Sequence, residues 1–145
     1  MGGLKYLLDA NVLSEPTKAL PDPRVCQKII AAQTTIATAS IVIDELGFGV
    51  SLLPPSKKRT LLESWLVSVM VELPVLSFDV DAARWHGRER ARLRQAGLTP
   101  SYCDGLIAAV AHVNGLVLVT RNTHDFRYFD ALQVENWFEP ENRSF

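Results

Sequence analysis

The amino-acid sequence predicts an α/β fold, a three-layer α/β/α sandwich around a central parallel sheet. The short strand-like segments, such as residues 5–8 and 116–119, are apolar at successive positions, which is typical of parallel strands that are covered on both faces. These segments alternate along the chain with stretches of helical character, as crossover connections between parallel strands require. The 145 residues are enough for about one domain, so we expect a single domain over residues 1–145.

The first half of the chain contains two predicted strands and three predicted helices. Residues 5–8 form a short strand that stops at an Asp-Ala-Asn segment, and a loop with three prolines follows. We expect a helix over about 24–33, a β-branched strand over 34–38 and a helix over about 41–53, which two prolines terminate. The next helix is indicated by apolar residues that recur on one face: Leu61, Leu62, Trp65, Leu66 and Val69.

The second half predicts two strands around a pair of helices, followed by a weak final strand. Residues 75–78 form a short strand, and the helix that follows extends to Gly97, a natural C-terminal stop. Another helix over 102–113 is apolar on nearly every side. Residues 116–119 are the strongest predicted strand, and Val134 lies in the weaker last one.

Composition and charge exclude several classes of protein. The chain is 48% hydrophobic and 21% charged, and 15 basic against 16 acidic side chains leave a formal net charge of −1. A strongly basic surface is therefore excluded, so a polyanionic partner must bind a local basic patch or a metal ion. No apolar run reaches the ~20 residues that cross a bilayer, and no signal-peptide pattern is present. Cys26 and Cys103 are typical of free thiols in a reducing compartment, so we expect no membrane association and a cytoplasmic location.

Four acidic residues can meet at one edge of the predicted sheet. In parallel sheets, ligands bind outside the carboxyl ends of the strands. Asp9 follows the first strand and Asp125 lies a few residues past the strand over 116–119. Glu45 and Asp104 lie on predicted helices and reach the same edge only if those helices begin beside it.

Each acid also has a structural explanation that the sequence alone leaves open. Asp9 can be a turn residue that binds its own backbone, and Glu45, next to Asp44, can be a solvated surface acid. Asp104 fits a capping pattern with Ser101, and Asp125 can cap a short helical turn over 125–128.

The four acids together indicate more than each does alone. Four carboxylates at one edge repel one another unless a proton or a cation neutralises them. Oxygen ligands select hard ions, so we expect Mg²⁺ or Mn²⁺ at Asp9, Glu45, Asp104 and Asp125. Such an ion activates water and stabilises charge on a phosphoryl oxygen, which makes phosphodiester hydrolysis the best-matched reaction.

At these residues the sequence resembles the PIN-domain family, and specifically the VapC-type toxins of toxin–antitoxin modules. The resemblance covers nearly the whole chain. It rests on five segments in family-like order: residues 6–14, 43–49, 104–109, 118–126 and 134–137.

The resemblance implies a PIN-like fold and a Mg²⁺- or Mn²⁺-dependent endoribonuclease, with Asp9, Glu45, Asp104 and Asp125 as catalytic, metal-binding acids. It implies hydrogen-bonding support for this pocket from Asn11, Thr120 and Asn122. It also implies a cognate antitoxin that blocks the acidic pocket, a toxin homodimer and toxin–antitoxin hetero-oligomers.

A surface that binds an RNA strand also needs positively charged side chains. Arg84, Arg88 and Arg92 are spaced four apart and share one helix face, and Arg121 adjoins the last acidic loop, so we predict that these four contact phosphates. Arg90 and Arg94 form a neighbouring row. Tyr102, beside Asp104, is a candidate for stacking on a base. The alternative for the helix is an ordinary solvated face.

Two other functions remain open. In a haloacid-dehalogenase-like phosphohydrolase Asp9 would attack phosphorus itself, but Asn11 stands where such enzymes place a second Asp. The second alternative is a non-catalytic binding module whose acidic pocket holds a structural cation or a basic peptide.

Overall fold

The protein is described by a computed structural model over residues 3–139, and its centre is a five-stranded sheet. The strand order is β3-β2-β1-β4-β5, and every pair is parallel. The strands are β1 (Tyr6–Leu8), β2 (Ile36–Ala39), β3 (Val75–Leu76), β4 (Val117–Val119) and β5 (Val134–Glu135). The predicted parallel sheet is therefore confirmed, and β1 is its central strand.

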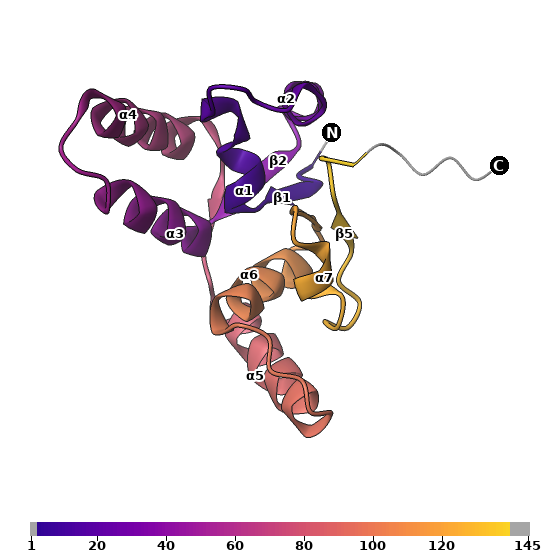
Figure 1. The fold of residues 1–145 in the computed structure, drawn as a ribbon. Helices are drawn as coiled ribbons and strands as arrows, with labels where there is room; N and C mark the ends of the chain where they lie inside the picture. The colour runs from indigo at the N-terminus through magenta and orange to yellow at the C-terminus, as the bar shows by residue number, and fades with distance from the viewer. Residues whose placement is uncertain (1–2, 140–145) are drawn as a thin grey trace.

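Helices connect the strands and cover the sheet (Figure 1). In Figure 1 the α3–α4 pair and the α5–α6 pair extend from different sides of the sheet. None of the helices within residues 3–139 is long and apolar enough to cross a bilayer. The helices are α1 (Ala10–Leu13), the 3-10 turn η1 (Glu15–Thr17), α2 (Pro23–Ala31), α3 (Ser40–Ser51), α4 (Lys57–Glu72), α5 (Val80–Gln95), α6 (Tyr102–Val113) and α7 (Thr123–Phe126).

The helix ends follow capping chemistry that the sequence carries. The side chains of Asp22, Ser56, Asp79 and Ser101 each accept a hydrogen bond from the backbone N–H two or three residues on, at the starts of α2, α4, α5 and α6. The short helix α1 was not predicted, because a single turn has no periodicity to detect. Its N-cap is Asp9. The helical turn expected over 125–128 lies at Thr123–Phe126 instead.

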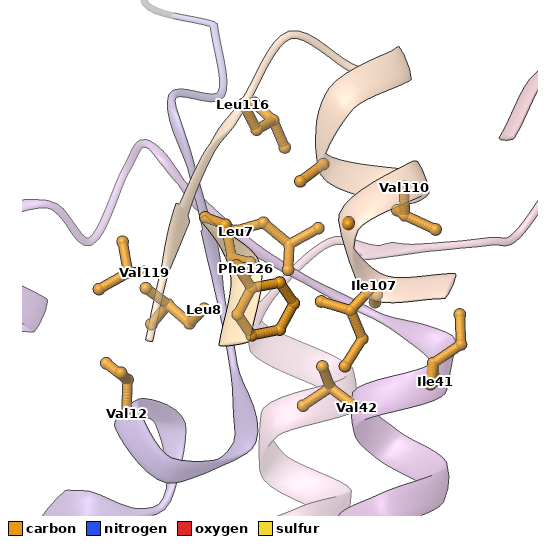
Figure 2. Packing of buried hydrophobic residues seen from close by; sticks show 14 of the residues in the cluster. Leu7, Leu8, Val12, Ile41, Val42, Ile107, Val110, Leu116, Val119 and Phe126 are labelled. Atoms are coloured by element: carbon orange, nitrogen blue, oxygen red, sulfur yellow. The ribbon is translucent and has the colours of Figure 1, made fainter. Parts of the chain in front are cut away.

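The core lies between β1, β4, the first turn of α3 and the middle of α6 (Figure 2). Leu7 and Leu8 of β1 are fully buried, as the continuous apolar pattern of this strand predicts. The ring of Phe126 from α7 packs against them and against Ile107 of α6. This packing fixes α7, and the loop that carries it, close to the end of β1.

The topology places a crevice between β1 and β4. The chain runs outward from β1 through β2 to β3, then returns across the sheet to β4 and continues outward to β5. Connections therefore leave β1 and β4 in opposite directions, and ligands of open α/β sheets bind at such a switch point. Asp9 directly follows β1 and Thr120 directly follows β4, so these two residues mark the crevice.

Candidate active site

Asp9 is held at the end of β1 by both of its carboxylate oxygens. Oδ1 accepts a hydrogen bond of 2.8 Å from the backbone N–H of Ala10, and Oδ2 accepts one of 2.8 Å from the Thr120 hydroxyl. The side chain is buried, with 6% of the residue exposed. Burial raises the pKa of Asp9, and these two hydrogen bonds oppose the rise. Asp9 thus binds its own backbone, as expected for a turn residue, and is also an acid held in one orientation in the crevice.

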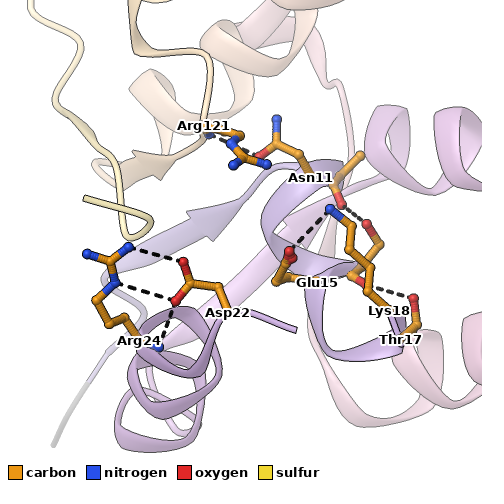
Figure 3. Close-up of polar contacts among 9 residues, drawn as sticks. Asn11, Glu15, Thr17, Lys18, Asp22, Arg24 and Arg121 are labelled. Carbon is orange, nitrogen blue, oxygen red and sulfur yellow. Dashed lines mark hydrogen bonds and ion pairs between the residues drawn. The ribbon is translucent and has the colours of Figure 1, made fainter. Parts of the chain in front are cut away.

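Thr120 joins the ends of β1 and β4. Its hydroxyl donates to Asp9 and accepts from the backbone N–H of Asn122 at 3.1 Å and from the Asn11 amide at 3.4 Å. The Asn11 carbonyl oxygen in turn accepts from the backbone N–H of Arg121 at 3.0 Å (Figure 3). Asn11 and Thr120 thus lie where support for Asp9 was expected, whereas Asn122 contributes its backbone and has an exposed side chain.

Glu45 and Asp104 face Asp9 from two helices. Glu45 lies in the middle of α3, and Asp104 is in the first turn of α6, where its backbone N–H donates to the Ser101 hydroxyl at 3.1 Å. Burial raises the pKa of Glu45, a hydrogen bond with the Cys103 thiol opposes the rise, and the charges of Asp9 and Asp104 add to it. The capping explanation of Asp104 is correct and does not remove this residue from the cluster.

Asp125 completes the group from α7. Burial raises the pKa of Asp104, the contact with Ser101 opposes it, and the charges of Asp9 and Asp125 raise it further. Asp104 and Asp125 line one pocket of about 380 Å³ with residues 98–101, His124 and Tyr128. Asp125 itself is exposed, and α7 begins two residues before it, so it does not cap that helix.

The four acids have the chemistry of a site for a hard divalent cation. Only carboxylate oxygens are offered, and the charges of neighbouring acids add to the raised pKa of Glu45 and of Asp104, an effect that a cation would reverse. As the side chains stand in residues 3–139, no three acidic, histidine or cysteine side chains are gathered tightly enough to enclose an ion. The residues able to hold one are Asp9, Glu45, Asp104 and Asp125.

Two contacts near this site were not predicted from the sequence. The Cys103 thiol, next to Asp104, forms a hydrogen bond with Glu45, and burial together with that contact raises the pKa of Cys103 to about 12. Glu15 in η1 is buried and pairs with Lys18 at 3.1 Å (Figure 3), and its Oε2 has no hydrogen-bond partner within residues 3–139. Neither residue belongs to a spacing pattern, so no signal in the sequence identified them.

The predicted phosphate-binding arginines do not share one environment. Arg84 and Arg88 line a pocket with Trp85 and His112. Arg92 forms an ion pair with Glu89 and donates to the Tyr128 carbonyl oxygen at 2.9 Å. Arg121 stands 4.3 Å from the centroid of the Phe138 ring. Their contact with RNA stays a prediction.

Comparison with known proteins agrees with this geometry. The family model described as the PIN domain matches residues 6–132. VapC ribonuclease Y4jK of Sinorhizobium fredii is 35% identical over 138 residues, which covers 92% of this chain and 98% of that protein. Toxin FitB of Neisseria gonorrhoeae is 31% identical over 137 residues, which covers 92% of this chain and 99% of that protein. The structure of VapBC2 from Rickettsia felis, bound to a DNA fragment from their promoter, contains a chain with a TM-score of 0.80 and 31% identity that matches 92% of this chain and 99% of its own length. The predicted resemblance is thus confirmed, and the chain belongs to the PIN-domain family.

Proposed function

We propose that this chain is the endoribonuclease toxin of a toxin–antitoxin module and that it hydrolyses RNA phosphodiester bonds with Mg²⁺ or Mn²⁺. The observation that carries the proposal is that acids from four separate segments influence one another near the switch point of the sheet. The charges of Asp9 and Asp104 act on Glu45, and those of Asp9 and Asp125 act on Asp104. Relatives named as a ribonuclease and a toxin support it, because their alignments with this chain cover more than nine-tenths of its length.

A divalent ion at this site would supply a Lewis acid that activates water and stabilises charge on the phosphoryl group. Asp9, Glu45, Asp104 and Asp125 would hold it. Thr120 donates its proton to Asp9, which keeps that carboxylate in one orientation with its remaining lone pairs available. Glu45 and Asp104, whose pKa values are raised by burial and by their neighbours, would lose any bound proton as the cation enters. Asp125, on the exposed rim, faces the approaching RNA strand.

The antitoxin would act by covering the acidic pocket with a cationic segment, and the toxin would pair with a second copy of itself. Several large apolar side chains on α3 and α4 are exposed and available for such contacts, namely Phe48, Leu52, Leu61, Val67 and Val71. Both cysteines are free, which fits a cytoplasmic location.

The phosphohydrolase alternative has no observation in its favour. Both oxygens of Asp9 accept hydrogen bonds, which weakens this carboxylate as a nucleophile. Such enzymes also use a lysine, and Lys57 and Lys58 stand at the start of α4, where neither lines the pocket of Asp104 and Asp125.

RNA cleavage by the purified, antitoxin-free chain tests the proposal. Cleavage is expected with Mg²⁺ or Mn²⁺ and not with chelator, and Asp9→Asn or Asp104→Asn should abolish it. Asp81→Asn is the matched control, since Asp81 is an exposed acid of α5 in a different pocket. Undiminished cleavage by both variants would exclude this mechanism. A divalent ion that raises the melting temperature while RNA stays intact would favour the binding module.

A further inference from the structure

A second pocket, lined by basic residues, adjoins the acidic one where the end of α5 meets the start of α6. Its volume is about 320 Å³, within the range of clefts that hold small ligands. Three residues of α5 spaced four apart line it, namely His86, Arg90 and Arg94, and α6 contributes Tyr102 and Gly105. These three side chains lie about one helical turn apart on the same face of α5, and that face borders the pocket.

The two arginines of this pocket carry charge that the protein does not neutralise. The Arg90 guanidinium lies 5.0 Å from the centroid of the Tyr102 ring, a cation–π contact. Within residues 3–139 neither Arg90 nor Arg94 forms an ion pair, in contrast to Arg92, which is paired with Glu89. Arg90 and Arg94 thus remain available to an anion.

Tyr102 offers an exposed aromatic surface in the same pocket as these charges. It is 57% exposed, and the edge contact of its ring with the buried His86, at 5.1 Å between centroids, holds it in place. An exposed ring fixed by its neighbours is the usual platform for a nucleic-acid base.

The basic pocket is continuous with the acidic pocket. Residues 98–101 line both. Tyr102 and Asp104 are two residues apart in the first turn of α6, which places their Cα atoms about 5 Å from each other. A strand whose phosphate lies at Asp104 and Asp125 would reach this pocket by crossing residues 98–101, which border both.

We propose that this pocket binds the RNA nucleotide next to the cleaved bond, with Arg90 and Arg94 on its phosphate and Tyr102 stacked on its base. The inference rests on the proposed ribonuclease function and specifies how the substrate is positioned. Phosphate contacts and stacking are tolerant of sequence, so this subsite positions the strand and contributes little to base selection.

The predicted row at Arg84 and Arg88 lies elsewhere on the same helix pair. These arginines line a pocket with His112, in the last turn of α6. His112 is eight residues from Asp104, which corresponds to about 12 Å along the helix axis. Arg84 and Arg88 therefore form a separate candidate row for phosphate contact, farther from Asp104, which the same experiment can test.

Equilibrium binding of a labelled single-stranded RNA separates the two rows. It is measured in chelator, so that no RNA is cut, between 50 and 200 mM salt. The double variant Arg90→Ala/Arg94→Ala should bind roughly tenfold more weakly. Its slope of log affinity against log salt should fall by about 0.7, the contribution of one phosphate contact on a single strand. Arg84→Ala/Arg88→Ala measures the other predicted row in the same assay. The control is Lys57→Ala/Lys58→Ala, which removes two exposed charges at the start of α4 and should leave affinity and slope near those of the parent chain.

Tyr102 is tested separately because stacking has a different signature. Tyr102→Ala should lower the affinity roughly fivefold to hundredfold, as the loss of one base stacked on an aromatic ring does, with little change in the salt slope. Tyr102→Phe should restore binding. A thermal melt of each variant confirms that it is folded.

The outcomes of these binding experiments test the subsite separately from the ribonuclease function. An unchanged slope for the Arg90/Arg94 variant, an equal loss in the Lys57/Lys58 variant, or a parent chain that does not bind RNA overturns the subsite. RNA binding that depends on Arg90 and Arg94, in a chain that cuts no RNA with any divalent ion, supports the subsite and refutes the ribonuclease function.

Discussion

Glu89 fastens the segment after α7 to α5, and its replacement by Gln should destabilise the protein in a pH-dependent way. The residue is 7% exposed, and its Oε1 accepts from Arg92 Nε at 3.0 Å and from the backbone N–H of Asp130 at 2.9 Å. Burial alone would raise the pKa of Glu89, but the hydrogen bonds from Arg92 and Asp130 outweigh it, and the pKa is lowered.

The magnitude follows from the loss of charge at a buried acceptor. Hydrogen bonds to charged groups contribute about 1.5–3 kcal/mol and neutral ones about 0.5–1.5 kcal/mol, so Glu89→Gln should cost about 1–2 kcal/mol at neutral pH. A carboxyl with a lowered folded-state pKa stabilises the protein above its unfolded pKa of about 4.3, and this contribution is lost as the pH falls through the folded value. The difference between variant and parent should therefore shrink below about pH 4.

Urea unfolding at several pH values between 3.5 and 7 measures this difference. Glu63→Gln is the control, because Glu63 forms a similar pair with Arg59 at 2.8 Å but is exposed, and it should leave the unfolding free energy unchanged within error. If Glu89→Gln costs the same free energy at pH 3.5 as at pH 7, the ionised state of Glu89 is not what stabilises this contact.

Three further substitutions test other parts of the structure. Thr120→Val removes the donor to Asp9 and should cost about 2 kcal/mol in urea unfolding and reduce cleavage, whereas Thr120→Ser should retain most of both. Gly105→Ala would place a Cβ 2.4 Å from His86 Nε2. Displacing the His86 ring should lower the unfolding free energy by about 1–3 kcal/mol, and unchanged stability would contradict this close packing. Phe126→Ala empties a fully buried site and should cost about 3–5 kcal/mol by thermal unfolding; a loss below 1 kcal/mol would show that α7 is not anchored through this ring.

Much of the fold follows from the sequence because periodicity and caps act locally. The apolar strands and the capped helices α4, α5 and α6 lie close to their predicted positions. Single-turn elements such as α1 escape prediction, since they depend on one cap at Asp9 and on tertiary packing.

The candidate site was predictable to a smaller extent. The predicted strand ends placed Asp9 and Asp125 near one edge of the sheet. The positions of Glu45 and Asp104 depend on how α3 and α6 pack, which the spacing of residues in the sequence does not determine. Spacing likewise puts arginines of α5 in rows without telling which row borders the acids. The α5–α6 pairing puts Arg90 and Arg94 in a pocket that shares residues 98–101 with the pocket of Asp104 and Asp125.

The hydrogen bond between Asp9 and Thr120 joins residues 111 positions apart, and this separation affects when the protein becomes active during synthesis. A ribosome has made most of the polypeptide before β4 exists to pair with β1. Until then β1 lacks a neighbour on one side, Asp9 lacks its donor, and the segment carrying Asp125 is still missing. A nascent chain that stops before α7 therefore lacks part of the acidic site, so the proposed RNA cleavage requires synthesis to have passed this helix.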